Sequence, residues 1–171
     1  MRSVIYSVAC SLDGYIARED GSYDWIPHEE DHGLEEFFRS VDTALIGRKT
    51  HDLMVNVGQP TFPGMTNYVF TRKLHPPKTK GVHWVNEDAV DFVRGLREQS
   101  GNKIWLAGGS ELARTFFEAG LVDELRMAVV PILLGSGIPL FPKLSCELPL
   151  RLMEEKAFGD GVMRLFYQVR R

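Results

Sequence analysis

The chain has only two cysteines in 171 residues, Cys10 and Cys146, too few for the disulfide framework of a small secreted domain, so a reducing cytoplasm is the expected compartment. No apolar run reaches the roughly 18 residues of a membrane-spanning helix. The apolar start at residues 4–12 is interrupted by serines and stopped by Asp13, which is too short for a signal peptide. Positive charge is not in excess, because 20 Lys and Arg face 23 Asp and Glu, for a net charge of −3. These absences argue against export, a membrane and nucleic acid as partners.

What is present is an ordinary globular composition, with 44% hydrophobic and 25% charged residues. The length fits a single domain over residues 1–171, and no repeat, low-complexity tract or linker divides it.

Strand-like and helix-like segments alternate along most of the chain. β-Rich runs predict strands at residues 4–9, 43–46, 68–70, 82–85, 103–107 and 125–130. Helical patterns follow Gly47, an expected N-cap at Asn86, and Gly109. Two final β-rich runs, 148–158 and 162–169, flank Gly159-Asp160-Gly161, a hairpin signal. The pattern predicts a three-layer α/β domain whose sheet is mostly parallel, with an antiparallel edge.

Two loops share one physical device, a buried strand followed by glycine and then by the start of a helix. They contain Gly47, Arg48, Lys49 and Thr50, and Gly108, Gly109, Ser110 and Glu111. Glycine lets a ligand approach the backbone, and free N–H groups at a helix start attract phosphate. Each loop alone is also consistent with an ordinary strand-to-helix turn, but both lie where parallel strands of one sheet end. Neither matches a dinucleotide or P-loop fingerprint.

A third candidate loop follows the strand at residues 68–70. Thr71, Arg72 and Lys73 supply a hydroxyl and two cations there. Arginine binds phosphate in a bidentate manner, so this cluster could bind an isolated 2′-phosphate and favour NADPH over NADH. A solvated basic loop is the alternative.

The segment from His28 to His32 matches the H-E-x-x-H pattern of zinc hydrolases. Its middle positions are acidic, Gly33 follows at once, and no third ligand is evident. Pro27 instead predicts that a helix starts here, where acidic residues favour the dipole. No metal is therefore expected.

An ordered series of motifs resembles the dihydrofolate-reductase-like proteins related to the reductase domain of the bifunctional riboflavin-biosynthesis deaminase-reductase. The motifs are SLDGYIA at 11–17, LIGRKT at 45–50, YVFTR at 68–72, IWLAGGSEL at 104–112, GLVDEL at 120–125 and PILLGSGIPLF at 131–141. The resemblance covers essentially the whole chain. It implies a dihydrofolate-reductase fold, NADPH as cofactor and a homodimer.

The resemblance also implies roles for individual residues. Cofactor contacts would come from Ala9 and Ile16 beside the nicotinamide and from the three loops, namely Gly47, Arg48, Lys49, Thr50, Thr71, Arg72, Gly108, Gly109, Ser110 and Glu111. Asp13 occupies the place of a substrate-side carboxylate.

Two departures from the family leave the substrate open. Residues 51–60 lack the Asp-Pro-x-Leu-x-x-Arg type segment of the riboflavin-pathway reductases, and no deaminase domain is present. Trp25, Pro27 and the acidic residues Glu29 and Asp31 resemble the Trp-Pro-acid order of dihydrofolate reductases, but with altered spacing.

The sequence therefore predicts an NADPH-dependent oxidoreductase that transfers a hydride to a C=N or C=O group of a small substrate. Asp13, Glu29 and Asp31 are the candidate catalytic carboxylates, and Trp25 is a candidate wall of the substrate pocket. Reduction of 5-amino-6-(5-phosphoribosylamino)uracil is the first candidate reaction and dihydrofolate reduction the second. A non-catalytic nucleotide-binding module is the alternative from another class.

Overall fold

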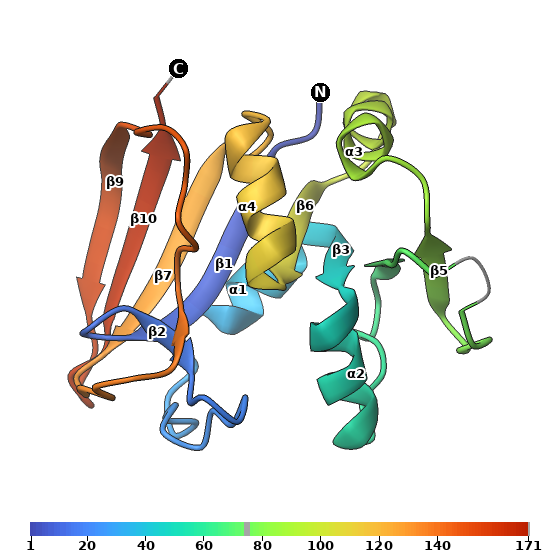
Figure 1. Ribbon diagram of the computed structural model, residues 1–171. Coiled ribbons are helices and arrows are strands. Elements are labelled where there is room, and N and C mark those ends of the chain that lie inside the picture. The colour runs from blue at the N-terminus through green and yellow to red at the C-terminus, as the bar shows by residue number, and fades with distance from the viewer. Residues whose placement is uncertain (74–75, 171) are drawn as a thin grey trace.

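An eight-stranded mixed sheet forms the centre of the computed structural model, which describes residues 1–73 and 76–170 (Figure 1). The strands of this sheet are β1 (Val4–Ser11), β3 (Val41–Gly47), β4 (Thr66–Phe70), β5 (Val82–Val85), β6 (Lys103–Gly108), β7 (Glu124–Val130), β9 (Leu150–Ala157) and β10 (Met163–Val169). A small second sheet pairs β2 (Tyr15–Ala17) with β8 (Ile138–Pro139). The helices are α1 (Leu34–Ser40), α2 (Arg48–Asn56), α3 (Ala89–Glu98) and α4 (Ser110–Glu118).

The order of strands in the main sheet is β5-β4-β3-β6-β1-β7-β10-β9. All pairings from β5 to β7 are parallel, and β10 and β9 add an antiparallel hairpin at one edge. This arrangement confirms the predicted fold class, including the C-terminal hairpin.

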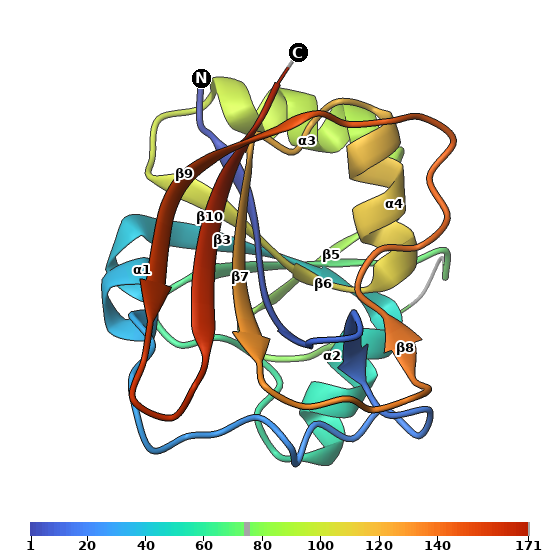
Figure 2. The ribbon, with the colours of Figure 1, turned by 90° about the vertical axis from the view of Figure 1, so that its left-hand side faces the viewer.

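Helices cover both faces of the sheet and create two core clusters. One cluster joins Tyr6 and Leu106 of the sheet to Phe116 of α4. The other joins Ile46 and Trp105 to Phe37 of α1. Figure 2 shows the sheet between these helices. The alternation of side chains along each strand explains why β1 contributes Tyr6 to one cluster and Ile5 to the other.

The two central strands separate toward their carboxyl ends. β1 pairs with β6 only from Val4 to Tyr6, whereas its pairing with β7 continues to Ser11. The indole Nε1 of Trp105 donates to the carbonyl of Ser7 at 3.1 Å, just beyond the last paired residue. The sheet therefore opens beside Ala9, the position at which open α/β sheets hold their ligands.

Two sequence predictions about helices need correction. The N-cap of α3 is Asp88 and not Asn86, because the Asp88 carboxylate accepts hydrogen bonds from the amides of Val90 and Asp91. Residues 28–33 form no helix, and α1 begins only at Leu34. His32 and Gly33 both have positive φ, 41° and 78°, which interrupts a right-handed helix at this place. Among the described residues, no helix combines the length and apolarity that crossing a membrane requires.

Candidate functional site

Three predicted loops meet because their strands are neighbours in the sheet. β6, β3 and β4 lie side by side and run parallel, with Gly47 in register with Phe70 and Ile46 in register with Gly108. Thr71, Gly47 and Gly108 therefore follow one another along the same edge. The structure thus brings together the three loops that the sequence predicted, one by one, as candidate cofactor-binding segments.

The two glycine loops are in direct backbone contact. A Cβ atom on Gly47 would lie 3.2 Å from both the Gly108 carbonyl oxygen and the Gly109 Cα, and one on Gly109 would lie 3.1 Å from the Gly47 Cα. Gly108 and Gly109 also have φ of 138° and 94°. Any side chain here would separate the loops or strain the chain. The glycines create a cradle made of backbone.

Two helix N-termini face this cradle without side-chain caps. Gly47 precedes α2 and Gly109 precedes α4, and neither position provides a capping hydrogen bond. Asp88, by contrast, caps α3. Uncapped amides and the helix dipole attract anions, so the residues present fit the phosphates of a dinucleotide. Thr50, Ser110 and Glu111 belong to the first turns of these helices.

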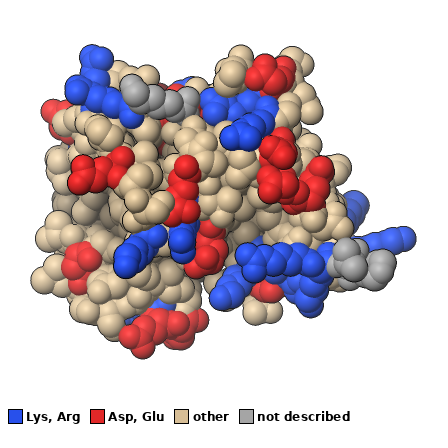
Figure 3. Space-filling view, turned by 45° about the horizontal axis from the view of Figure 1, so that its top comes forward, with Lys and Arg blue, Asp and Glu red and all other residues tan. Residues whose placement is uncertain are grey.

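Cationic side chains surround the same edge. Arg48 is partly buried, whereas Lys49 and Arg72 are exposed. Thr71 is nearly buried, and its hydroxyl accepts a hydrogen bond from the Lys73 amide at 3.1 Å. Figure 3 shows a continuous band of Lys and Arg side chains at the lower right of the face that is drawn.

Ala9 and Ile16 occupy different surroundings. Ala9 lies on β1 beyond the point where β6 leaves it, partly exposed and in register with Ala128 of β7. Ile16 lies on β2 and packs against the core cluster of α3 and α4. Ala9 thus lies at the opening of the sheet, and the family resemblance implies that the nicotinamide would bind beside it.

The three candidate carboxylates are separate in the structure. Asp13 accepts hydrogen bonds from the amides of Leu134 and Gly135, at 3.1 and 2.8 Å, and from the hydroxyl of Ser11 at 2.6 Å. The bond from Ser11, with those from the loop amides, lowers the pKa of the Asp13 carboxyl and keeps it ionised. Asp13 therefore fixes the loop after β7, and its proposed catalytic role stays a prediction.

Glu29 and Asp31 lie on the segment of residues 18–33, which we name the strap. Both are exposed, and Asp31 accepts a hydrogen bond from the Glu35 amide at 3.0 Å, at the start of α1. No hydrogen bond links these two carboxylates to Asp13 within residues 1–73 and 76–170.

The strap runs along the edge at which the parallel strands end. Figure 2 shows it passing below β7 and the β9–β10 turn to reach α1. His32 Nε2 and Asp160 Oδ2 are 2.7 Å apart, and Gly21 packs near Leu53 of α2. Trp25 is partly buried on the strap, and its indole N–H is buried without a partner among the described residues. Such a donor is available to a bound molecule or a water.

The zinc-site alternative finds no support in this geometry. His28 and His32 do not lie on one face of a helix, because the segment is not helical. The His32 ring is also hydrogen-bonded to the Asp160 carboxylate. In the described part of the chain, no three His, Cys, Asp or Glu side chains are placed to hold a metal ion.

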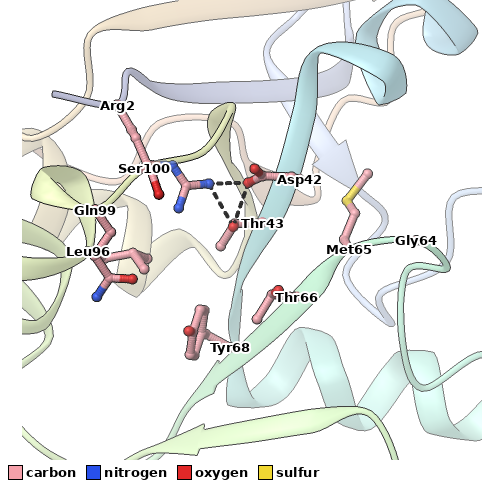
Figure 4. Close-up of a pocket in the computed structure, with 10 residues that line it drawn as sticks. All are labelled: Arg2, Asp42, Thr43, Gly64, Met65, Thr66, Tyr68, Leu96, Gln99 and Ser100. Carbon is pink, nitrogen blue, oxygen red and sulfur yellow. Dashed lines mark hydrogen bonds and ion pairs between the residues drawn. The ribbon is translucent and has the colours of Figure 1, made fainter.

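A cavity of about 550 Å³ lies at the opposite edge of the sheet, where β3 and β4 begin (Figure 4). Arg2 is held there by Asp42 and by the Thr43 hydroxyl. None of the predicted site residues lines it. In the cradle, Gly47 and Gly108 are buried and Gly109 is partly exposed.

Sequence reasoning missed the side chains that contact Arg48. Asp52 accepts a hydrogen bond from Arg48 Nε at 2.8 Å, and the guanidinium carbon lies 5.9 Å from the centre of the Trp84 ring. The i,i+4 spacing could have revealed Asp52. Trp84 comes from a distant strand, so no local pattern could have revealed it.

Known proteins share this architecture. A family model described as the RibD C-terminal domain matches residues 2–164. The uncharacterized protein YwjB of Bacillus subtilis is 42% identical over 166 residues, covering 94% of this chain and 95% of its own length.

Two solved structures show the same fold. A putative riboflavin biosynthesis protein from Shewanella is 26% identical, with a TM-score of 0.88 and 99% of each chain covered. Dihydrofolate reductase from Enterococcus faecalis, complexed with NADP(H), is 16% identical, with a TM-score of 0.74 covering 99% of this chain and 97% of that one. The family model, which matches most of the chain, shows that this chain belongs to the RibD C-terminal domain family of reductases, and the mixed sheet agrees with it.

Proposed function

We propose that this protein is an NADPH-dependent reductase that transfers a hydride to a C=N or C=O group of a small heterocyclic or ribosylamino substrate. The observation that carries the proposal is the pair of uncapped helix N-termini at Gly47 and Gly109, which meet backbone to backbone beside the basic loop at Thr71. This cradle suits the phosphates of a dinucleotide. The NADP(H) complex of the Enterococcus reductase supports the same choice of cofactor.

The residues of this chain would position the reactants. Bound NADPH supplies the hydride, and the cradle would fix its phosphates so that the nicotinamide reaches the opening beside Ala9. Holding two carbons about 3–3.5 Å apart contributes most of the catalysis in such transfers. The strap would cover the substrate from the other side, with Trp25 as a wall. A carboxylate, Asp13 or its alternatives Glu29 and Asp31, would orient the substrate and move a proton through water.

The first substrate to test is 5-amino-6-(5-phosphoribosylamino)uracil, because the family resemblance points to its reduction. Dihydrofolate is the second. Two free cysteines, one of them exposed, support a cytoplasmic location. A cofactor-binding module without turnover is the second candidate function. It is favoured by one observation, namely that the oxygens of Asp13 are engaged by loop amides.

Titration with NADPH and NADH, followed by nicotinamide fluorescence, tests the cofactor assignment. Arg48→Ala should weaken NADPH binding by at least about tenfold, since a hydrogen bond to a charged group contributes roughly 1.5–3 kcal/mol. Binding of neither cofactor would remove the reductase proposal. Tight binding without oxidation of NADPH by pteridines or the ribosylaminouracil would favour the non-catalytic module.

A further inference from the structure

The guanidinium of Arg48 is fixed on two sides before any ligand binds. Its Nε donates to both carboxylate oxygens of Asp52, at 2.8 and 3.1 Å, and its carbon lies 5.9 Å from the centre of the Trp84 ring. A cation at this distance from an indole face is attracted by the ring. Within the described residues, the two terminal amino groups of Arg48 have no hydrogen-bond partner. They remain available as a planar fork for an oxyanion.

Trp84 is itself held by a buried histidine. The rings of His51 and Trp84 are 5.1 Å apart and nearly perpendicular, at 79°. His51 is only 2% exposed, and both of its ring nitrogens lack partners among the described residues, as does the Trp84 indole nitrogen. Burying unpaired polar atoms costs stability that an aliphatic side chain would not cost. The ring pair therefore serves something other than plain packing.

The charge of His51 is compatible with an adjacent arginine. Burial lowers the pKa of the His51 imidazole, and the charge of Arg48 lowers it further against the opposing effect of Asp52. The ring is neutral near pH 7 and does not repel the guanidinium.

The ring pair directs Arg48 away from the glycine cradle. Trp84 lies on β5, which is separated from β3 by β4, so Arg48 leans outward over the end of β4. The Thr71 amide donates to the carbonyl of Val85, the neighbour of Trp84, at 2.9 Å. Arg48 is thus beside the basic loop that begins at Thr71. The cradle and this outer position are two separate places for phosphate.

We propose that Trp84 and His51 are positioning residues that hold the Arg48 guanidinium ready to bind a phosphate monoester, the group that distinguishes NADPH from NADH. This inference rests on the proposed function and adds the source of its cofactor selectivity. The ligand class of the outer position is a terminal phosphate with two or more free oxygens. The diester-like pyrophosphate remains with the cradle at Gly47 and Gly109.

Variants of Trp84 test this inference through the ratio of the two cofactor affinities. Trp84→Leu should weaken NADPH binding about fivefold and NADH binding by less than about twofold, as expected when a partly desolvated cation–π contact is lost. Trp84→Phe keeps an aromatic face and should restore most of the ratio. His51→Leu should give a smaller loss of the same kind. His83→Leu is the matched control, because His83 is the exposed neighbour of Trp84 on β5 and contacts Tyr68 instead.

Each outcome decides between the two proposals. If the wild-type protein binds neither cofactor, both fail. If it binds NADPH and Trp84→Leu lowers both affinities equally, or changes neither, the inference fails and the cofactor assignment stands. If Trp84→Leu does not fold, His51→Leu carries the comparison, and an unchanged ratio in that variant contradicts the positioning role.

Discussion

Replacing Gly109 with alanine tests whether the contact between the two glycine loops is structurally required. The residue has φ of 94°, and the new Cβ would lie 3.1 Å from the Gly47 Cα. A left-handed conformation costs an L-residue about 1–2 kcal/mol. Forcing an additional methyl group into packed backbone adds about 1–3 kcal/mol. We therefore expect Gly109→Ala to lower the free energy of unfolding by about 2–5 kcal/mol.

Gly120 provides a control at the other end of the same helix. It follows α4 with φ of 65°, and a Cβ there would meet nothing within 4 Å. Gly120→Ala should therefore cost only the conformational strain, about 1–2 kcal/mol. Urea unfolding of the two variants, with NADPH titration of the folded protein, separates strain from loop contact. NADPH affinity should fall in Gly109→Ala alone. Equal losses of stability, together with unchanged NADPH affinity in both variants, would refute the cradle.

Three further predictions concern the rest of the molecule. Asp123 binds the buried guanidinium of Arg97 through both oxygens, at 3.0 and 2.9 Å, and accepts the Val4 amide, so Asp123→Ala should lower the unfolding free energy by about 3–5 kcal/mol in urea. Burial raises the pKa of the Cys10 thiol from 9.0 to about 11. The buried Cys10 thiol contributes fully to stability below pH 9, and this contribution is lost as pH rises toward 11, because the thiol of the unfolded chain ionises first. The urea midpoint of Cys10→Ala should therefore decline less over that pH range than the midpoint of the wild-type protein. Light scattering should give twice the 19.4 kDa chain mass if the expected homodimer forms, and a mass of one chain at micromolar concentration would reject it.

Much of the fold follows from local patterns in the sequence. Continuous apolar runs such as residues 43–46 predicted the buried parallel strands, and β5 has the bounds that were expected. The Asp-Gly signal predicted the final hairpin. The errors have local causes. Asn86 and Asp88 are both good caps, and in the structure the Asp88 side chain is the one that accepts the amides of the first turn. Pro27 suggested a helix start, but positive φ at His32 and Gly33 delays α1 to Leu34.

The candidate site was predictable in its backbone and not in its long-range side-chain contacts. Glycines after buried strands indicated the cradle, because glycine at a strand end permits close approach. The contact of Trp84 with Arg48 joins residues 36 positions apart in the chain. The engagement of Asp13 by the loop at Gly135 joins residues 122 positions apart. Local spacing carries no information about such pairs.

The place of β1 between β6 and β7 has a consequence for synthesis on the ribosome. β1 emerges before its partners, because it pairs with residues from Ile104 onward on one side and with residues from Glu124 onward on the other. Its hydrogen-bonding edges and apolar side chains stay without native partners until most of the chain has been made. Non-local parallel pairing of this kind slows folding and exposes strand edges to aggregation. Nascent chains that end before β7 should therefore depend on chaperones, and the sheet should close only when the segment up to Val130 has left the exit tunnel.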